Sequence, residues 1–183
     1  MKFVGFILMV FLLGGCELRD PEPPSEGSSA FKPPVTAEIV LDNFKSAVID
    51  HNVDNYLRCF IDTSASTRKF SFSASGDFQG IFANWGKEEE RRYFENLGPP
   101  AQSVPVLEFS DLREQNRTSI STEYTANYLL FYPHEKSGVA KQVRGYIHLY
   151  LTLDNQQRWA IYQWDDRKTV TDSTWSYLKY HVY

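Results

Sequence analysis

The chain has 183 residues, with 19 basic and 23 acidic side chains and a formal net charge of −4. Affinity for nucleic acid depends largely on basic side chains that neutralise phosphates, so a mildly acidic chain without a basic run is not expected to bind nucleic acid. The four histidines lack the short spacing of metal ligands, and the chain has no glycine motif for phosphates or dinucleotides. We therefore expect neither a metal ion nor a cofactor.

The first residues are typical of an export signal. Phe3 to Leu13 form an apolar run of 11 residues behind Lys2. As a helix this run would rise only about 16 Å, roughly half the hydrocarbon thickness of a bilayer. It therefore suits the core of a signal peptide better than a membrane-spanning helix. The end of the run, Leu13-Gly14-Gly15-Cys16, resembles the lipobox of bacterial lipoproteins.

This resemblance implies that residues 1–15 are a lipoprotein signal peptide, that Cys16 is acylated on its sulfur, and that Cys16 becomes the new N-terminus. The mature chain would then lie in the cell envelope, anchored by its lipid to the extracytoplasmic side of a bacterial membrane. An ordinary secretory leader with an incidental Cys16 is the alternative, but the cysteine follows directly on two glycines, which favours lipidation. Loss of Lys2 leaves 18 basic and 23 acidic residues, so the anchor rather than charge must hold the chain at the membrane.

Residues 16–34 are expected to form a linker between the anchor and one folded domain. Residues 17–34 contain five prolines and few side chains that could form a core, which is typical of a semi-extended spacer. With Cys16 acylated, Cys59 is the remaining thiol, so no intramolecular disulfide can form. Residues 35–183 are long enough for a single domain that is stabilised by its hydrophobic core.

Two amphipathic helices are predicted at the start of this domain. The first is expected to begin near Thr36, and Asn52 is expected to cap the second. Apolar residues recur at helical spacing in both segments: Val40, Phe44, Ala47 and Val48, then Val53, Tyr56, Leu57 and Phe60. Cys59 lies beside the second stripe, so we interpret it as a buried small residue and not as a nucleophile.

A hairpin and a third helix are predicted to follow. Phe70 and Phe72 alternate with serines, which favours a short hairpin within 66–82. Residues 86–97 predict a helix, because glutamates crowd its first turn and Gly98 follows its end. We interpret the charge run in this helix as helix electrostatics and not as a metal or binding site.

The second half of the chain predicts an antiparallel meander of long strands, near 104–112, 118–132, 140–153 and 158–166. Alternation gives each strand a core face and a second face. The second face carries four aromatic candidates for an interface: Tyr146, Tyr150, Tyr162 and Trp164. Three alternatives remain for what packs against this aromatic face. They are a second copy of the chain, a ligand, or the C-terminal tail with Trp175, Tyr177, Leu178 and Tyr180.

The order of these elements resembles the nuclear transport factor 2-like superfamily, which includes ketosteroid-isomerase-like and SnoaL-like proteins. Two features add to the resemblance: the helix pair from Phe44 to Phe60, followed by Ile61-Asp62, and the late strand with Arg158-Trp159-Ala160-Ile161. The resemblance covers 35–166. It implies an α+β fold in which three N-terminal helices pack on a curved antiparallel sheet around a cone-shaped pocket, with frequent dimerisation through the outer face of the sheet.

Candidate residues for such a pocket can be named from the strand pattern. They are Tyr124, Tyr128, Trp159, Gln163 and Asp165. A carboxylate in an apolar pocket can have its pKa raised into the range of a general base. The alternative, which we favour, is that Asp165 and Asp166 end a strand at the solvent edge. No catalytic residue is assigned from the resemblance.

Two functions of different classes follow. The first is a lipid-anchored, non-catalytic binding or assembly module, acting on an envelope protein, on a second copy or on a small apolar ligand. The second is an enzyme of the ketosteroid-isomerase or SnoaL type that performs acid-base chemistry on a small apolar substrate. A simple structural tether for an envelope complex is a third possibility. The state of the pocket distinguishes them, because catalysis needs an open pocket with a desolvated acid or base.

Overall fold

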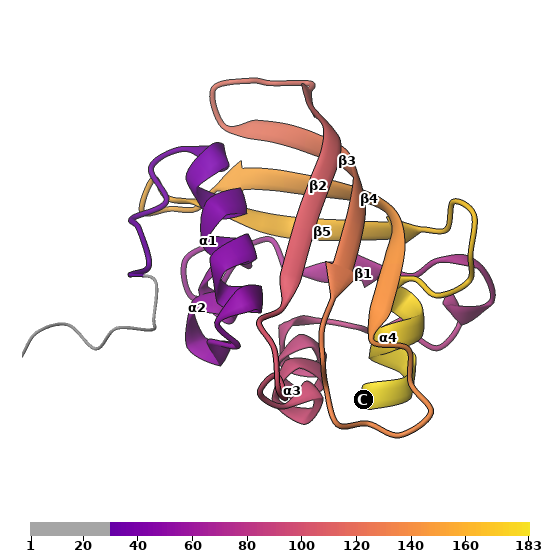
Figure 1. The fold of residues 1–183 in the computed structure, drawn as a ribbon. Coiled ribbons are helices and arrows are strands. Elements are labelled where there is room, and N and C mark those ends of the chain that lie inside the picture. The colour runs from indigo at the N-terminus through magenta and orange to yellow at the C-terminus, as the bar shows by residue number, and fades with distance from the viewer. Residues whose placement is uncertain (1–29) are drawn as a thin grey trace, which may run out of the picture.

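The computed structural model describes residues 30–183. The predicted signal peptide, Cys16 and linker residues 17–29 lie outside this range. Within it, every helix is too short or too polar to cross a bilayer. The fold combines helices with one five-stranded sheet, as expected for the α+β class (Figure 1).

The first helices begin at the capping residues that the sequence pattern indicates. The Thr36 side chain accepts a hydrogen bond from the Ile39 backbone N–H at the start of α1, Ala37–Ile49. The Asn52 side chain accepts one from the Asn55 N–H at the start of α2, Val53–Arg58. Such caps satisfy donors that the first turn of a helix leaves without a partner. The third helix, α3, is Lys87–Leu97 and ends at Gly98, whose φ is +73°.

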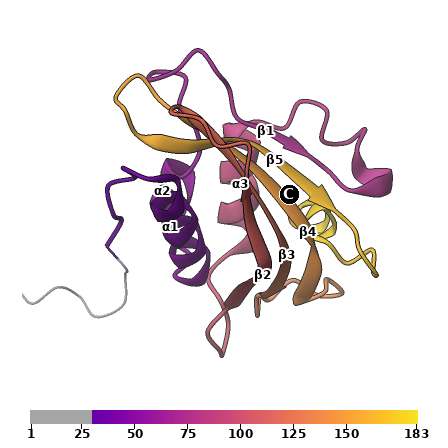
Figure 2. The same ribbon diagram turned by 90° about the horizontal axis from the view of Figure 1, so that it is seen from above.

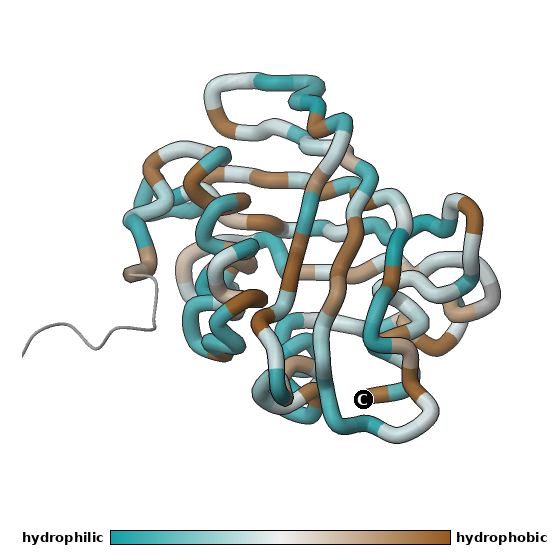
Figure 3. Tube along the Cα trace, viewed as in Figure 1, coloured by the Kyte–Doolittle hydropathy of each residue, from teal (hydrophilic) through white to brown (hydrophobic). Residues whose placement is uncertain are grey.

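Four long strands form the predicted meander. They are β2 (Val106–Gln115), β3 (Ser121–Phe131), β4 (Gln142–Leu153) and β5 (Trp159–Arg167). The sheet order is β1-β5-β4-β3-β2, with antiparallel pairing between the four long strands. Figure 3 shows hydrophobic and hydrophilic residues alternating along these strands.

The hairpin predicted within 66–82 is wrong. The only strand there, β1 (Ser71–Ser73), pairs in parallel with β5, and a short 3-10 turn, η1 (Gly76–Phe78), follows it. The alternation of aromatic residues reflects burial of Phe72, whose ring lies 5.2 Å from that of Trp164 between centroids. Because β5 supplies the partner, the chain needs no hairpin, and the sheet is mixed and not purely antiparallel.

A β-bulge in β5 decides which residues face the interior. Tyr150 pairs with Gln163, whereas Leu151 pairs with Ile161, so Tyr162 is an extra residue in β5. An extra residue reverses the facing of all later residues relative to simple alternation. The expectation that Gln163 and Asp165 point inward is therefore wrong, and so is the placement of Trp164 on the outer face.

The helices pack on the inner face of the sheet, which carries Leu107, Tyr128, Ile147, Leu149 and Trp164. Figures 1 and 2 show α1, α2, α3 and the C-terminal helix gathered there. The outer face carries Glu123, Tyr146, His148, Tyr150 and Asp165.

The C-terminal tail forms the helix α4, Trp175–Val182, and enters the interior. The Trp175 ring lies 4.7 Å from that of Trp164, 5.4 Å from Tyr128 and 5.8 Å from Phe44 between centroids. Trp175 and Leu178 are each 1% exposed. Of the three covers considered for the outer aromatic face, the tail is thus excluded, because its apolar stripe is buried against the opposite face.

Candidate functional site

The interior beneath the sheet contains a buried carboxylate with three donors from three elements. Glu90 of α3 has no exposed surface. Its Oε1 accepts a hydrogen bond from the Tyr56 hydroxyl of α2. Its Oε2 accepts from Trp85 Nε1 at 2.6 Å and forms an ion pair with Lys179 Nζ of α4 at 2.7 Å. Both oxygens are therefore occupied by groups of the protein.

The ammonium group of Lys179 lies among aromatic rings. Its Nζ is 3.5 Å from the ring centroid of Phe72 and 3.8 Å from that of Trp164. Tyr93 and Trp85 lie further out, at 5.5 and 5.6 Å. Complete burial lowers the pKa of Lys179 to about 8, although the Glu90 carboxylate opposes the shift.

A second buried carboxylate, Asp166 of β5, fixes the start of α4. Asp166 accepts hydrogen bonds from the Tyr128 hydroxyl at 2.7 Å, from the Ser176 N–H at 2.7 Å and from Ser176 Oγ at 2.5 Å. The Tyr128 hydroxyl in turn accepts from the Trp175 N–H at 2.6 Å. Burial raises the pKa of Asp166 in spite of these donors. The alternative that Asp166 ends its strand in solvent is therefore wrong.

The structure does not bring the five predicted pocket residues together. Tyr128 faces the interior and binds Asp166, and Tyr124, on the same face, donates to Glu38 of α1 at 3.0 Å. Trp159 lines a groove at the start of β5. Gln163 and Asp165 lie on the outer face, where Gln163 Nε2 donates to Asp165 Oδ1 at 2.9 Å.

The outer face carries three of the four predicted interface residues, and its polar groups pair with one another. Tyr146, Tyr150 and Tyr162 are half-buried, and Trp164 lies inside instead. The Tyr150 hydroxyl donates to Asp165 Oδ2 at 3.3 Å. His148 Nε2 lies 2.9 Å from Glu123 Oε2, and the His148 ring stacks on Tyr150 with 4.0 Å between centroids. The result is a surface with half-buried tyrosine rings, of which Tyr150 is held by Asp165 and His148.

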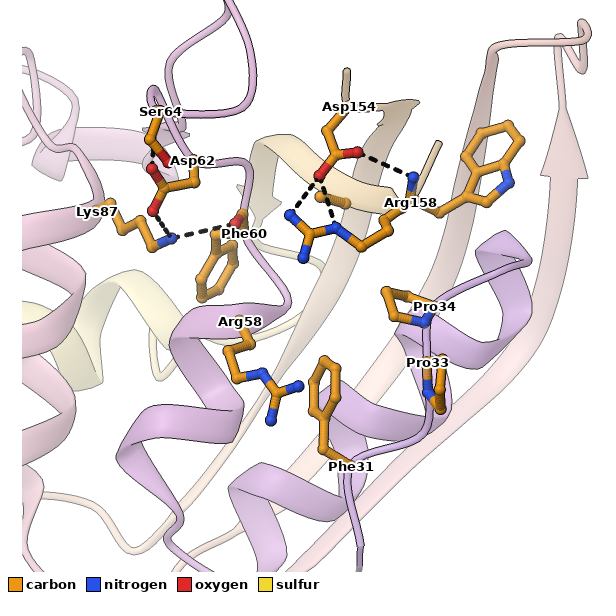
Figure 4. A pocket seen from close by; sticks show the side chains of 12 residues that line it. Phe31, Pro33, Pro34, Arg58, Phe60, Asp62, Ser64, Lys87, Asp154 and Arg158 are labelled. Atoms are coloured by element: carbon orange, nitrogen blue, oxygen red, sulfur yellow. Dashed lines mark hydrogen bonds and ion pairs between the residues drawn. The ribbon is translucent and has the colours of Figure 1, made fainter. Parts of the chain in front are cut away.

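An open groove of about 420 Å³ lies where the linker meets the domain (Figure 4). Its walls come from the linker, the loop after α2, the start of α3 and the β4–β5 turn. Lys87 donates to Asp62 at 3.0 Å, and Arg158 forms an ion pair with Asp154 at 2.8 Å. The Arg58 guanidinium lies 3.8 Å from the ring centroid of Phe31. Most charged groups in the groove therefore have partners within the chain.

Metal chemistry and thiol chemistry find no support in residues 30–183. No group of three or more His, Cys, Asp or Glu side chains in this part of the chain could hold a metal ion. Cys59 is buried, and its Sγ donates to the Asn55 carbonyl at 3.3 Å. Burial raises the pKa of this thiol, so the thiolate is disfavoured, which agrees with the interpretation of Cys59 as a packing residue.

Glu90 and Lys179 were not identified from the sequence, although a signal for them exists. Glu90 lies on the apolar stripe of its helix with Tyr93, Phe94 and Leu97. Lys179 lies on the stripe of Trp175, Leu178 and Val182. A charged residue within an apolar stripe indicates burial, and two such residues of opposite sign indicate a pair.

Comparison with known proteins identifies the fold. No protein-family model matches the chain, and no curated protein matches it in sequence. Among solved structures, a nuclear transport factor 2-like protein of unknown function from Shewanella oneidensis MR-1 is 15% identical, with a TM-score of 0.52 over 70% of this chain and 93% of that chain. A nuclear transport factor 2-like protein from Cytophaga hutchinsonii ATCC 33406 is 10% identical, with a TM-score of 0.53 over 71% and 93%.

A third similar structure is the β subunit of benzoate 1,2-dioxygenase from Burkholderia mallei ATCC 23344. It is 10% identical, with a TM-score of 0.52 over 74% of this chain and 91% of that chain. At such identities the similarity establishes the fold alone. The chain therefore has a nuclear transport factor 2-like fold, and its function must be argued from its own residues.

Proposed function

We propose that the chain is a lipid-anchored, extracytoplasmic binding or assembly module that does not catalyse a reaction and that binds a protein partner through the outer face of its sheet. The observation that carries this proposal is the position of α4. Trp175, Leu178 and Lys179 fill the space between helices and sheet in which an enzyme of this fold would hold its substrate.

The buried acids support the same conclusion. A general acid or base must reach the proton that it transfers. Glu90 has no exposed surface and Asp166 is 2% exposed, and the hydrogen bonds that each accepts come from side chains and backbone of this chain. These contacts disfavour the ketosteroid-isomerase or SnoaL type of enzyme, and they also disfavour a small apolar ligand in the interior.

The outer face has the chemistry of a protein interface. Tyr146 and Tyr150 each combine a large ring with a hydroxyl, and such residues are enriched at protein interfaces. His148 and Glu123 supply a polar pair beside them. The chain enters the domain away from this face: the Lys32 N–H donates to Asn43 of α1, and the Pro34 carbonyl accepts from the Trp159 N–H at the opposite end of β5 from Asp165.

Site-specific photocross-linking in membranes tests the proposed interface. A photoreactive phenylalanine analogue replaces Tyr146 on the outer face, or Tyr180 on the exposed side of α4 as a matched control. We expect an adduct from position 146 and none from position 180. An adduct of twice the chain mass identifies a homodimer, and another mass identifies an envelope partner. Absence of any adduct from position 146 would contradict the proposed interface.

The anchor needs a separate test. Mass spectrometry of the mature chain should show an N-terminal Cys16 that carries a diacylglycerol. Cys16→Ser should lack the diacylglycerol without any change in the fold of the domain. An unmodified Cys16 in the membrane-bound protein would refute the lipid anchor.

A further inference from the structure

The surroundings of Lys179 have the composition of a binding site for an organic cation. The rings of Phe72 and Trp164 contact the ammonium group, and Tyr93 and Trp85 lie behind them. The faces of aromatic rings carry negative potential and attract cations, most strongly where water is excluded. The four rings come from β1, β5, α3 and the loop before α3, so the chain builds this box by tertiary structure and not by one local motif.

Glu90 gives the box its charge. The carboxylate lies at one side of the ammonium group, 2.7 Å from Nζ, and Tyr56 and Trp85 hold it there by donating hydrogen bonds. These two donors belong to α2 and to the loop before α3. The box and its counter-charge therefore consist of residues outside α4, and Trp175 of α4 packs against two of its walls, Trp164 and Tyr93.

Trp164 contributes the face of its ring to the site. Within residues 30–183, Trp164 Nε1 is the one buried side-chain nitrogen or oxygen that lacks a hydrogen-bond partner. The same indole ring forms a wall of the box. The Nε1–H group lies in the plane of the ring, so it does not point at an ammonium group above the ring face, and a donor cannot pair with another donor.

Stability alone would not require this arrangement. A well-packed apolar side chain in place of a buried ion pair is often neutral or stabilising. A helix with leucine or methionine at position 179 and an uncharged residue at position 90 would close the interior equally well. Aromatic walls and a fixed carboxylate are the groups that recognise a cation.

We propose that the interior of this domain is a binding site for an alkylammonium group, and that Lys179 of α4 is its built-in occupant. The site belongs to the body of the fold, and α4 fills it in the same way as a separate ligand with a primary amine would. This inference does not depend on the lipid anchor or on the outer face.

Chemical rescue in the full-length chain tests the proposal. Lys179→Ala removes the side chain beyond Cβ, and the n-propylammonium ion replaces the atoms removed. The ion should raise the thermal unfolding midpoint of Lys179→Ala in a saturable manner. At ten times its dissociation constant, it should favour the folded state by a factor of about 11 in the unfolding equilibrium. The wild type, whose site is filled, should show no such response.

Two controls separate charge recognition from cavity filling. 1-Propanol has a similar size but no charge and should stabilise Lys179→Ala far less than n-propylammonium. Leu178→Ala leaves a cavity in the same helix without the carboxylate, and n-propylammonium should not stabilise it more than 1-propanol does. Equal rescue by 1-propanol, or a response to neither compound, would overturn the proposal.

A measurement on the wild type covers the case in which Lys179→Ala does not fold. Protons above the face of an aromatic ring are shifted upfield in proton NMR spectra. The ε-methylene protons of Lys179 should therefore resonate upfield of those of every other lysine. A value within the range of the exposed lysines would show that the aromatic box does not hold the cation, and would refute the site.

Discussion

Glu90 of α3 and Lys179 of α4 meet at 2.7 Å across 89 residues of sequence, and neither has any exposed surface. Their contact favours one register of the C-terminal helix, because Glu90 is the carboxylate that forms an ion pair with this ammonium group. A single buried polar contact that selects one arrangement among several apolar ones is a known way to specify structure. The contact therefore holds α4 in the position in which it fills the interior of the fold.

Removal of one partner of this pair should destabilise the fold strongly. Glu90→Gln leaves a buried ammonium group without its counter-charge, and loss of one member of a buried pair typically costs about 3–5 kcal/mol. Glu88→Gln on the same helix is the matched control, because its ion pairs with Arg91 and Arg92 are exposed and should contribute about 0.5 kcal/mol or less. Equilibrium urea unfolding measures both. Equal effects of the two variants would show that burial of Glu90 does not decide its contribution.

Stability should rise with pH where Lys179 loses its proton. Its pKa is about 8 in the folded chain against 10.5 ordinarily, so between these values the unfolded chain binds a proton that the folded chain lacks. The free energy of unfolding then increases with pH in this window. Glu90, which pairs with the ammonium group, and Asp166 both oppose the shift. Burial also raises the pKa of Tyr56 and of Tyr93. Above their ordinary pKa of 10.0 the unfolded chain loses phenol protons that the folded chain retains, so these two residues lower the free energy of unfolding as pH rises further.

The measurement is urea unfolding at pH 7, 8, 9 and 10. The reference is Glu90→Gln/Lys179→Met, which lacks both charges but keeps the tyrosines. The wild type should gain stability relative to this double variant from pH 8 upward. A constant difference across the series would show that Lys179 does not titrate in this range.

Because Tyr162 is the extra residue of the bulge, it is not needed to direct the later side chains of β5 to their correct faces of the sheet. Without Tyr162, Ile161 would be followed directly by Gln163, and simple alternation would still direct Trp164 inward. Deletion of Tyr162 should therefore give a folded chain with a cooperative unfolding transition. Deletion of His148, another half-buried residue of the outer face, should abolish folding, because β4 is regular there and every residue on one side would change face. Circular dichroism and thermal unfolding distinguish these outcomes; two folded variants would contradict the assigned register.

The pattern of residues predicts local elements well and their mutual placement poorly. Thr36 and Asn52 identify helix starts because capping depends on neighbours within three residues. The facing of Gln163 and Asp165 could not be obtained in this way, because a bulge depends on pairing with β4 and leaves no mark in the alternation of one strand.

The tail shows the same limit. The apolar residues Trp175, Tyr177 and Leu178 indicate a buried segment, but both faces of the sheet offered aromatic partners. The choice of the inner face depends on Lys179 and Ser176, which find Glu90 and Asp166 only there. Such pairing between distant charged and polar residues is not contained in hydrophobic periodicity.

Trp175 should be the apolar residue on which closure of the interior most depends. Its ring packs against Phe44, Tyr128 and Trp164, and its Nε1 donates to the Tyr93 hydroxyl at 2.9 Å. Trp175→Ala leaves a large cavity and an unpaired hydroxyl, and tryptophan-to-alanine changes in cores cost about 3–5 kcal/mol.

Tyr177→Ala provides the matched comparison, because Tyr177 is half-buried on the same helix and contacts His181 at its surface. Truncation there should cost clearly less, since it opens no interior cavity. Urea unfolding measures both variants, and binding of a hydrophobic dye to the native state reports whether the interior has opened. If Trp175→Ala were as stable as Tyr177→Ala and bound no dye, α4 would not be the element that closes the fold, because an interior packed by α1, α2 and α3 alone would not need this ring.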